Sequence, residues 1–194
     1  FYLAKHNYEP DLNGQGRELV VRKDAAINTF WGSTNKWANS NHRAWCNNGY
    51  KARFSAPVQS AMGQTIYEYT EGEGNRTLQT RADAVWELSV YESLPRWDSI
   101  YDTYMDKEGE PIPMRSALFP CYNDSGAMVR WSTRSPRYEK NEGQDYNVNY
   151  YDDDGRTFPS ATSPTSNYYS RPCFCLPPTA FVDINLNLDE TTLG

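Results

Sequence analysis

The residues best suited to covalent chemistry are a few histidines and cysteines. His42 and Cys46 lie four positions apart, so on a helix they would share one face. A Cys–His nucleophile could be built there, but nothing in the sequence is placed to orient the histidine. Cys173 and Cys175 are separated by one residue, which on a strand puts both on one face as small core side chains. These spacings match no zinc-binding signature.

The four cysteines, which include Cys121, are predicted to be free thiols, because 194 residues can bury a core without cross-links. No nucleophile elbow, phosphate-binding loop, zinc-protease motif or dinucleotide-binding motif occurs. Carboxylates are numerous, but the sequence singles out no acid–base pair. We therefore predict a protein that is not an enzyme and uses no cofactor and no metal. The triplet Asp152–Asp154 leaves a calcium site open as an alternative to a plain turn.

The composition restricts the partners. With 25 acidic and 19 basic residues the formal net charge is −6, which argues against nucleic acid as a partner. No run of apolar residues is long enough for a membrane span, so we predict no membrane insertion. The 15 tyrosines and 6 tryptophans argue against disorder. The length is that of one domain, residues 1–194.

The coarse pattern predicts an α+β fold. One helix is expected over 40–46, capped by Ser40 and ended by Asn47–Gly49. A second is expected over 55–62, between Ser55 and Gly63, and a further helical stretch over 113–119. Strands are expected over 2–4, 18–23, 65–70, 84–88, 129–133 and 172–176, and a loop over 71–75. Helices come early and strands dominate late, without the alternation of a doubly wound fold.

The segment Arg137–Ser170 has a composition of its own. Of its 34 residues, 21 are Tyr, Asn, Asp, Ser or Thr, a mixture typical of binding surfaces. On a strand over 146–151, an inward Val148 would leave Asn147, Asn149 and Tyr151 exposed. The predicted ligand-binding residues are Arg137, Tyr138, Lys140, Asn141, Asp145, Asn147, Asn149, Tyr151, Asn167 and Tyr169. The alternative is a solvated loop with one hairpin turned by residues 152–155.

Several segments, in order along the chain, resemble the motifs of one domain family. They are Lys5–Tyr8 with Glu18–Lys23, then Trp37–Asn47 (W-x-x-S-x-x-R-x-W-L-N), Ala84–Glu92 (V-F-L-L-S-x-x-E), Trp131–Pro136 (W-x-R-S-P with one inserted residue) and Ser170–Leu176 (G-x-R-P-A-F-x-L). The chain departs from these motifs at Cys46, Ser170 and Cys173. The family has no assigned function and is frequent in phages and prophages of Gram-positive gut bacteria.

The resemblance implies a C-type lectin-like fold, near the formylglycine-generating-enzyme-like domains. Such a fold places two helices on small antiparallel sheets beside a long irregular lobe that binds ligands. It implies core positions for Trp37, Trp45, Trp86 and Trp131, and buried acceptors for Arg43, Arg134 and Arg171. The mixture in 137–170 also resembles the variable region of diversity-generating-retroelement proteins. Formylglycine formation and calcium-dependent sugar binding are not implied, because their motifs are absent.

Together these features predict a non-enzymatic ligand- or receptor-binding domain. Its partner would be a host cell-surface protein or glycan, and its location a phage tail, another virion surface or an extracellular surface. The alternative is a structural virion component, such as a decoration or baseplate protein, whose polar loops contact only other virion proteins. The sequence leaves a homo-oligomer open in either case.

Overall fold

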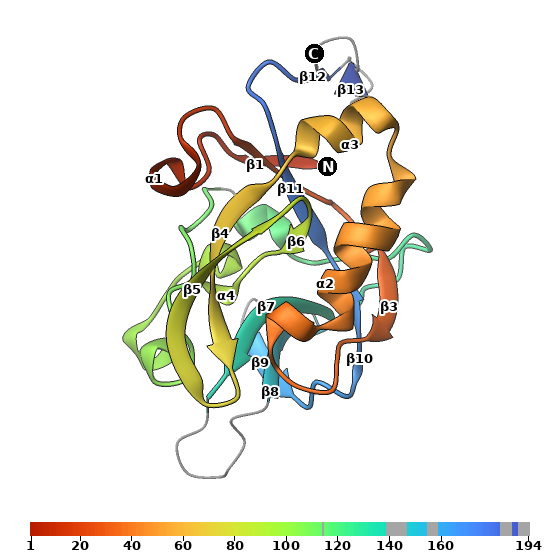
Figure 1. Cartoon of the computed structure of the whole chain (residues 1–194). Helices are drawn as coiled ribbons and strands as arrows, with labels where there is room; N and C mark the ends of the chain where they lie inside the picture. The colour runs from red at the N-terminus through yellow and green to blue at the C-terminus, as the bar shows by residue number, and fades with distance from the viewer. Residues whose placement is uncertain (114, 139–146, 155–158, 183–187, 190–194) are drawn as a thin grey trace.

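The first sheet brings together strands from the two ends of the chain. The structure is a computed structural model that describes residues 1–113, 115–138, 147–154, 159–182 and 188–189. Four strands lie in the order β1 (Tyr2–Lys5), β2 (Glu18–Val21), β11 (Pro172–Leu176) and β6 (Trp86–Glu87), and all neighbours are antiparallel. Every residue of β11 is buried, so this late strand runs through the core (Figure 1). The strands expected at these positions are confirmed.

The second sheet is formed mainly by residues that follow position 130. Its strands lie in the order β3 (Ile27–Phe30), β10 (Asn167–Ser170), β7 (Trp131–Arg137), β8 (Asn147–Tyr151) and β9 (Pro159–Thr162). The β10–β7 pair is parallel, and the other pairs are antiparallel. The described part of Arg137–Ser170 therefore contributes strands to a sheet, among them the strand expected over 146–151, which is β8.

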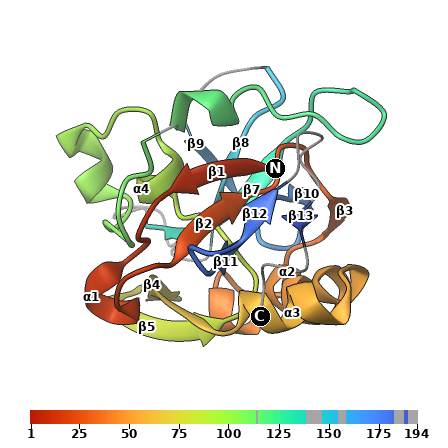
Figure 2. The same cartoon turned by 90° about the horizontal axis from the view of Figure 1, so that it is seen from above.

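A separate hairpin, β4 (Thr65–Gly72) with β5 (Asn75–Asp83), lies on the outside of the molecule (Figures 1 and 2). Its turn is Glu73-Gly74, with φ angles of 51° and 79°. Two successive positive φ angles characterise the type I′ turn, whose twist matches that of antiparallel strands. The strand expected over 65–70 is confirmed, and the expected loop over 71–75 is this turn. A short pair, β12 (Phe181–Val182) with β13 (Leu188–Asp189), completes the strands.

Of the two expected helices, the second contacts β11 of the first sheet and the first contacts β3 of the second sheet. α2 (Asn41–Trp45) begins after Ser40, whose hydroxyl accepts a hydrogen bond from the Arg43 N–H at 3.0 Å. α3 (Ala56–Met62) ends at Gly63, which has a φ of 55°. No helix in the described ranges is long and apolar enough to cross a membrane. Short helical turns precede and join these helices: α1 (Pro10–Asn13), η1 (Trp37–Asn39), the π-helical η2 (Cys46–Tyr50) and η3 (Lys51–Arg53).

The end of the first helix differs from the expectation. Asn47–Gly49 does not end the helical path, because the chain continues through η2 into η3. Gly49 serves another purpose, since a Cβ there would come within 2.7 Å of the Trp45 ring. The glycine lets the indole lie against this turn, and Trp45 is only half-buried instead of lying in the core.

Residues 88–130 form the long excursion with little regular secondary structure, which we call the lobe (green in Figure 1). The lobe contains α4 (Val90–Ser93), η4 (Ser99–Thr103) and η5 (Arg115–Leu118), the last within the helical stretch expected over 113–119. α4 begins with a capping box in which Ser89 and Glu92 each accept a hydrogen bond from the other's backbone N–H. Phe119 of the lobe packs against Trp131 and Tyr151 of the second sheet. The irregular region of this domain thus precedes the segment Arg137–Ser170 in the chain.

Aromatic side chains fill much of the core. Trp37, Trp86 and Trp131 are buried as expected, and Trp31 is buried as well. Tyr67 stacks on Trp86 with ring centroids 5.2 Å apart and ring planes 10° apart. All four cysteines are buried free thiols, as the sequence predicts. The sulfur atoms therefore contribute packing and no cross-link.

The three motif arginines satisfy buried acceptors, as the resemblance implies. Arg43 forms a two-point ion pair with the Asp83 carboxylate at 2.6 and 2.9 Å. Arg171 donates to the backbone carbonyls of Arg22, Lys23 and Leu118. Arg134 is completely buried and donates to the Glu68 and Glu87 carbonyls and to the Glu92 carboxylate. A planar group with five donors suits such positions because it can serve several acceptors at once.

Candidate functional site

The histidine–cysteine pair does not form a reactive site. His42 Nδ1 lies 2.9 Å from the Glu87 carboxylate and 3.0 Å from the Ser132 hydroxyl, while Nε2 lies 3.1 Å from the Thr29 carbonyl oxygen. Cys46 is completely buried, and burial raises the pKa of its thiol well above the usual value. Because the thiolate is the nucleophile, a thiol held in the protonated form is unreactive.

Ser132, His42 and Glu87 form a group that the sequence does not reveal, because they come from three distant segments. The Ser132 hydroxyl donates to the second Glu87 oxygen at 2.9 Å. In a Ser-His-acid triad the hydroxyl and the carboxylate bind opposite ring nitrogens, whereas here both contact Nδ1. None of the three side chains is exposed. We conclude that this group stabilises the junction of α2, β6 and β7.

Three of the residues predicted to bind a ligand are buried. The exposed fractions are 5% for Tyr138 and 0% for Asn149 and Tyr151. The predicted inward position of Val148 is confirmed, since it belongs to the core cluster on the other face of β8. The predicted exposure of Asn149 and Tyr151 is wrong, because the lobe covers Tyr151 and the irregular pairing of β7 with β8 encloses Asn149.

Tyr151 packs as a core residue between the second sheet and the lobe. Its ring stacks on Trp131 at 4.7 Å and meets Phe119 edge-on at 4.6 Å, both between ring centroids. Its hydroxyl lies 3.0 Å from the Ser93 hydroxyl oxygen of α4. The polar end of the ring is thereby satisfied inside the protein, as buried tyrosines require.

Asn149 is buried because it completes an irregular part of the sheet. The pairing of β7 with β8 shifts register between Ser132 and Pro136. The Asn149 amide donates to the Ser135 and Pro136 carbonyls at 3.1 and 3.0 Å. Carbonyl groups at a bulge lose their regular partners and must find others. Asn149 therefore has a structural role.

Of the remaining predicted residues, those that the structure describes do not gather on one face. Asn167 is exposed on β10 opposite Phe30, and Tyr169 is half-buried. The Tyr169 hydroxyl accepts a hydrogen bond from the Asn123 amide at 3.2 Å. Its ring helps line an open pocket of about 350 Å³, together with residues 25–28 and 123–125. Lys140, Asn141 and Asp145 lie outside the described residues.

Arg137 and Tyr138 lie where three distant segments meet at the end of β7. The Arg137 guanidinium lies 4.5 Å from the centroid of the Tyr104 ring, and the Arg76 guanidinium lies 5.0 Å from that of Tyr138. We call Arg76, Tyr104, Arg137 and Tyr138 the Arg–Tyr junction. Asn147, also predicted from the sequence, faces Arg137 across the β7–β8 pair. The junction thus joins the β4–β5 hairpin, the lobe and the second sheet.

Arg76 fixes the lobe to the hairpin. Its guanidinium donates to the Asp106 carboxylate at 2.8 and 3.0 Å. It also donates to the backbone carbonyls of Asp102, Thr103 and Met105. One side chain therefore anchors the end of η4 at several points, and the sequence carries no signal for this contact because the partners lie about 30 positions away.

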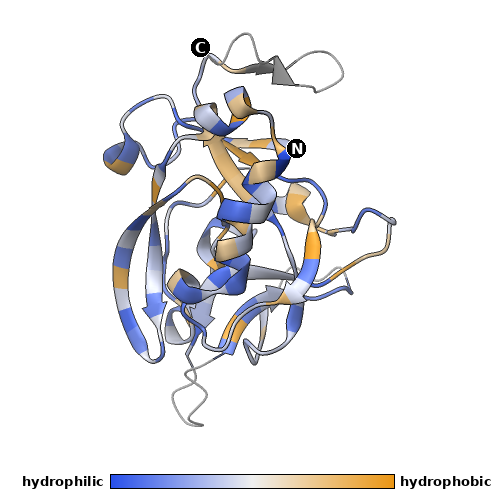
Figure 3. Ribbon diagram, turned by 45° about the vertical axis from the view of Figure 1, so that its right-hand side comes forward, coloured by the Kyte–Doolittle hydropathy of each residue, from blue (hydrophilic) through white to orange (hydrophobic). Residues whose placement is uncertain are grey.

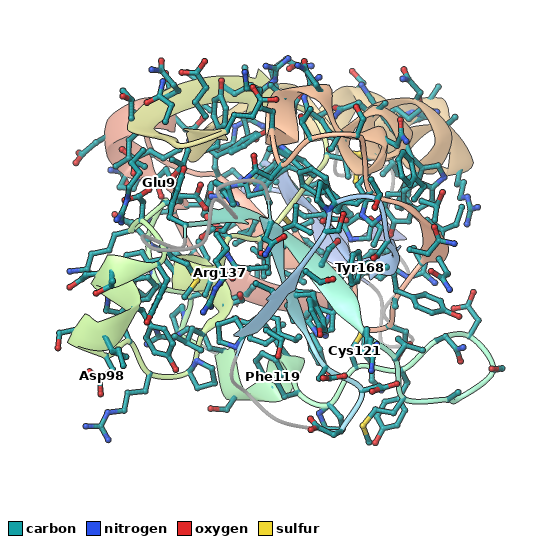
Figure 4. The ribbon with its side chains drawn as sticks, turned by 90° about the horizontal axis from the view of Figure 1, so that it is seen from below. Glu9, Asp98, Phe119, Cys121, Arg137 and Tyr168 are labelled. Atoms are coloured by element: carbon teal, nitrogen blue, oxygen red, sulfur yellow. The ribbon has the colours of Figure 1, made fainter. Side chains whose placement is uncertain are left out.

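The lobe that supplies Tyr104 to the junction also carries a series of three aromatic rings. Tyr91 meets Trp97 edge-on with centroids 4.9 Å apart, and Trp97 lies 5.5 Å from Tyr101. These rings are half-buried, and Ile100 beside them is 60% exposed. In Figure 4, Arg137 and Asp98 lie on the left side of the view and Tyr168 lies on the right. The sequence contains these aromatics, but their spacing shows no periodic pattern that would mark a surface.

The acidic turn at 152–154 shows no sign of a metal site. Asp152 pairs with the Arg130 guanidinium at 2.8 Å, and Asp153 lies 3.4 Å from the same group. In the described ranges, no group of three or more His, Cys, Asp or Glu side chains is arranged to hold a metal ion. The Arg130 guanidinium therefore partly neutralises the charge of these carboxylates.

Glu9 gives the domain a predicted pH dependence. Burial, and then the nearby carboxylates of Glu92 and Glu68, raise the pKa of Glu9 from 4.5 to about 7, against the opposing charges of Arg134 and Lys5. Folding favours the protonated form of Glu9. The contribution of this proton to the stability of the fold is therefore complete below pH 4.5 and is lost as the pH rises through about 7.

We expect Glu9→Gln to abolish this pH dependence, because the amide carries no proton to lose. The variant should be more stable than the wild type above about pH 7, and the difference should change by about 1.4 kcal/mol per pH unit through the window. Urea unfolding of both proteins across this range would measure it. A difference in unfolding free energy between the two proteins that is constant with pH would show that Glu9 is not the titrating group.

The fold and the surface define an α+β domain of two small sheets, with an aromatic lobe held between a hairpin and the second sheet. The chain belongs to a family described as a domain of unknown function, DUF6273, which matches residues 15–178. No curated protein and no solved structure gives a significant match.

Proposed function

We propose that the domain is a non-enzymatic binding module and that its ligand surface consists of Arg76, Tyr104 and Arg137 of the Arg–Tyr junction with the ring series of the lobe. The buried Tyr138 supports Arg76 and is not itself part of the contact surface. The observation that supports this most is the stacking of two arginines on two tyrosines from three distant segments. Tryptophan, tyrosine and arginine are the residues most enriched at energetic hot spots of interfaces. An exposed Ile100 beside half-buried rings adds apolar area to such a surface.

The anchoring of the lobe supports the same proposal. A surface that is already held in place loses less conformational entropy when it binds. Arg76 ties η4 to β5, and the buried Arg134–Glu92 ion pair, at 2.6 Å, ties α4 to β7. The lobe is therefore held at α4 and at η4, the two helical turns that contain Tyr91 and Tyr101.

The partner that we propose is a protein or glycan on a host cell surface. A C-type lectin-like fold and a place on a phage tail, a virion surface or an extracellular surface belong to the same proposal, and the resemblance of the motifs supports them. The burial of Tyr138, Asn149 and Tyr151 gives no support to a variable face of the retroelement type in 137–170.

Two substitutions should test the surface. Ile100→Asp and Arg137→Ala are each expected to weaken binding by tenfold or more, about 1.4 kcal/mol, because they remove apolar area and a stacked cation. Glycan and host-surface protein arrays would identify a ligand, and titration of that ligand would measure the loss. Asn167→Ala is the matched control, since Asn167 is exposed on β10, away from the junction. Equal losses in all three variants would rule the surface out.

The second candidate is a structural virion component. It is supported by the burial of three residues that the sequence predicts to contact a ligand. In that case the polar groups of these residues form hydrogen bonds that stabilise the sheet, as the Asn149 amide does at the bulge. This candidate predicts that neither array shows binding and that the domain is found in purified particles.

A further inference from the structure

β5 presents an open strand edge. In the part of the chain that the structure describes, β5 pairs with β4 alone, and the six residues Asn75–Thr80 are all exposed. Consecutive exposed residues on a strand mean that both of its faces meet solvent. Figures 1 to 3 show the hairpin on the outside of the molecule, with β5 mostly hydrophilic. Such an edge carries backbone groups that can pair with another strand.

The usual protections of a strand edge are weak in β5. Natural edge strands are kept short, interrupted by proline, covered, or guarded by free charges. β5 has nine residues and no proline, and Leu78 is 43% exposed. The guanidinium of Arg76, the first arginine of β5, is bound to Met105 and Asp106 of the lobe, so its charge does not oppose an approaching strand. The middle of β5 is therefore available for pairing.

The two ends of the hairpin carry opposite charges. At the tip, among the residues that the structure describes, Glu71 and Glu73 lie beside Lys36, whose ammonium lies 2.6 Å from Glu73. These three described side chains together carry one more negative than positive charge.

At the base, Arg43 and Arg81 share one carboxylate, that of Asp83, at 2.6 and 3.6 Å. The base therefore has an excess of one positive charge. Lys36, Glu73, Arg43 and Arg81 are partly exposed, so their charges can act on a neighbouring molecule, whereas Asp83 is buried.

We propose that β5 pairs antiparallel with β5 of a second copy of this chain, about a two-fold axis. In this arrangement the acidic tip of each copy lies beside the basic base of the other, so the attraction occurs twice. A parallel pairing would instead bring tip against tip. The two hairpins become one four-stranded sheet, and the contact is closed because each copy offers the same surface. This dimer goes beyond the proposed binding function and does not depend on it.

The interface is small, so we expect a dimer that depends on concentration. Sedimentation equilibrium should show reversible monomer–dimer exchange, and the dissociation constant should rise with salt as the charges are screened. A wild-type protein that stays monomeric at its highest soluble concentration overturns the proposal.

A charge-swap experiment tests the orientation. Glu73→Arg makes the tip positive, and Arg81→Glu makes the base negative. The homodimer of each variant should have a dissociation constant about tenfold higher than that of the wild type, because like charges then face each other at both ends of the interface. An equimolar mixture should recover the dimer, because a positive tip meets a negative base at one end and the native pair remains at the other. Failure of the mixture to recover overturns the antiparallel pairing.

Matched controls make similar charge changes outside the hairpin. Asp124→Arg alters an exposed residue in the lobe, and Lys23→Glu alters an exposed residue near the end of β2. Neither variant should change the dissociation constant of the dimer. Single cysteines at Leu78, Gln79 and Thr80 provide an independent test, because the four native thiols are buried. Near a two-fold axis a residue meets its own copy, so one of these positions should form an intermolecular disulfide. A dimer with no cross-link at any of them overturns the proposed interface.

Discussion

Replacing Arg134 by Met is expected to lower the free energy of unfolding by about 3–5 kcal/mol. Arg134 and Glu92 have no exposed side-chain surface, and their charged atoms lie 2.6 Å apart. The substitution leaves the Glu92 carboxylate buried without its cation, and it removes the donor to the Glu87 and Glu68 carbonyls. Urea unfolding of variant and wild type would measure the difference. Such a loss is a large part of the stability of an ordinary domain.

Arg130→Met is the matched control for this prediction. Arg130 is also paired with a carboxylate, that of Asp152, at 2.8 Å, but its side chain is 54% exposed. An exposed pair contributes about 0–1 kcal/mol, so the control should stay close to the wild type. Similar losses for the two variants would show that Arg134 is not the buried anchor of the lobe. Limited proteolysis should cut the lobe of Arg134→Met faster, because the tie between β7 and α4 is gone.

The second large effect is expected at Tyr151. Tyr151→Ala should cost about 3–5 kcal/mol, the range for a large buried aromatic, because it opens a cavity beside Trp131 and Phe119. Tyr151→Phe keeps the ring and loses only the contact with the Ser93 hydroxyl, so it should cost about 1 kcal/mol. Thermal or urea unfolding distinguishes the two. Trp131→Ala belongs to the same range, since it removes the other half of the stack.

Asn167→Ala provides the comparison for Tyr151. Both residues were predicted to bind a ligand, but Asn167 is exposed and its loss should stay within about ±0.5 kcal/mol. If Tyr151→Ala were as mild as Asn167→Ala, the ring would be on the surface. The pair of variants therefore separates a core role from a surface role within one segment.

Local features of this fold are readable from the sequence because they depend on neighbours in the chain. Ser40 and Gly63 mark helix ends through their own hydrogen bonding and backbone freedom. The alternation in 146–151 places Val148 inward because successive strand side chains point to opposite faces. The same holds for β11, whose apolar run predicts a buried strand and is one. The composition also predicts free thiols, which the structure contains.

The sequence alone could not decide which faces are covered. Alternation separates the two faces of β8, but burial of Tyr151 on the second face depends on the lobe, which comes from residues 88–130, and burial of Asn149 depends on the irregular pairing of β7 with β8. Asn149 and Tyr151 are therefore polar residues in a core, and the composition of 137–170 misleads because it resembles a surface. The Arg–Tyr junction and the Ser132–His42–Glu87 group likewise join segments with no local signal.

What the sequence by itself determined is the α+β class, the helix ends at Ser40 and Gly63 and the strand alternation. The resemblance of its motifs implied the buried acceptors of the three arginines. Only the tertiary structure decided where the irregular lobe lies, which tyrosines are exposed and which strand edge stays open. The physical reason is that turns, caps and strand alternation are fixed by interactions within a few residues. Burial and electrostatic environment are instead sums over every segment that packs nearby. For Tyr151 that sum includes a ring 32 positions earlier in the chain, Phe119, and no local rule reaches that far.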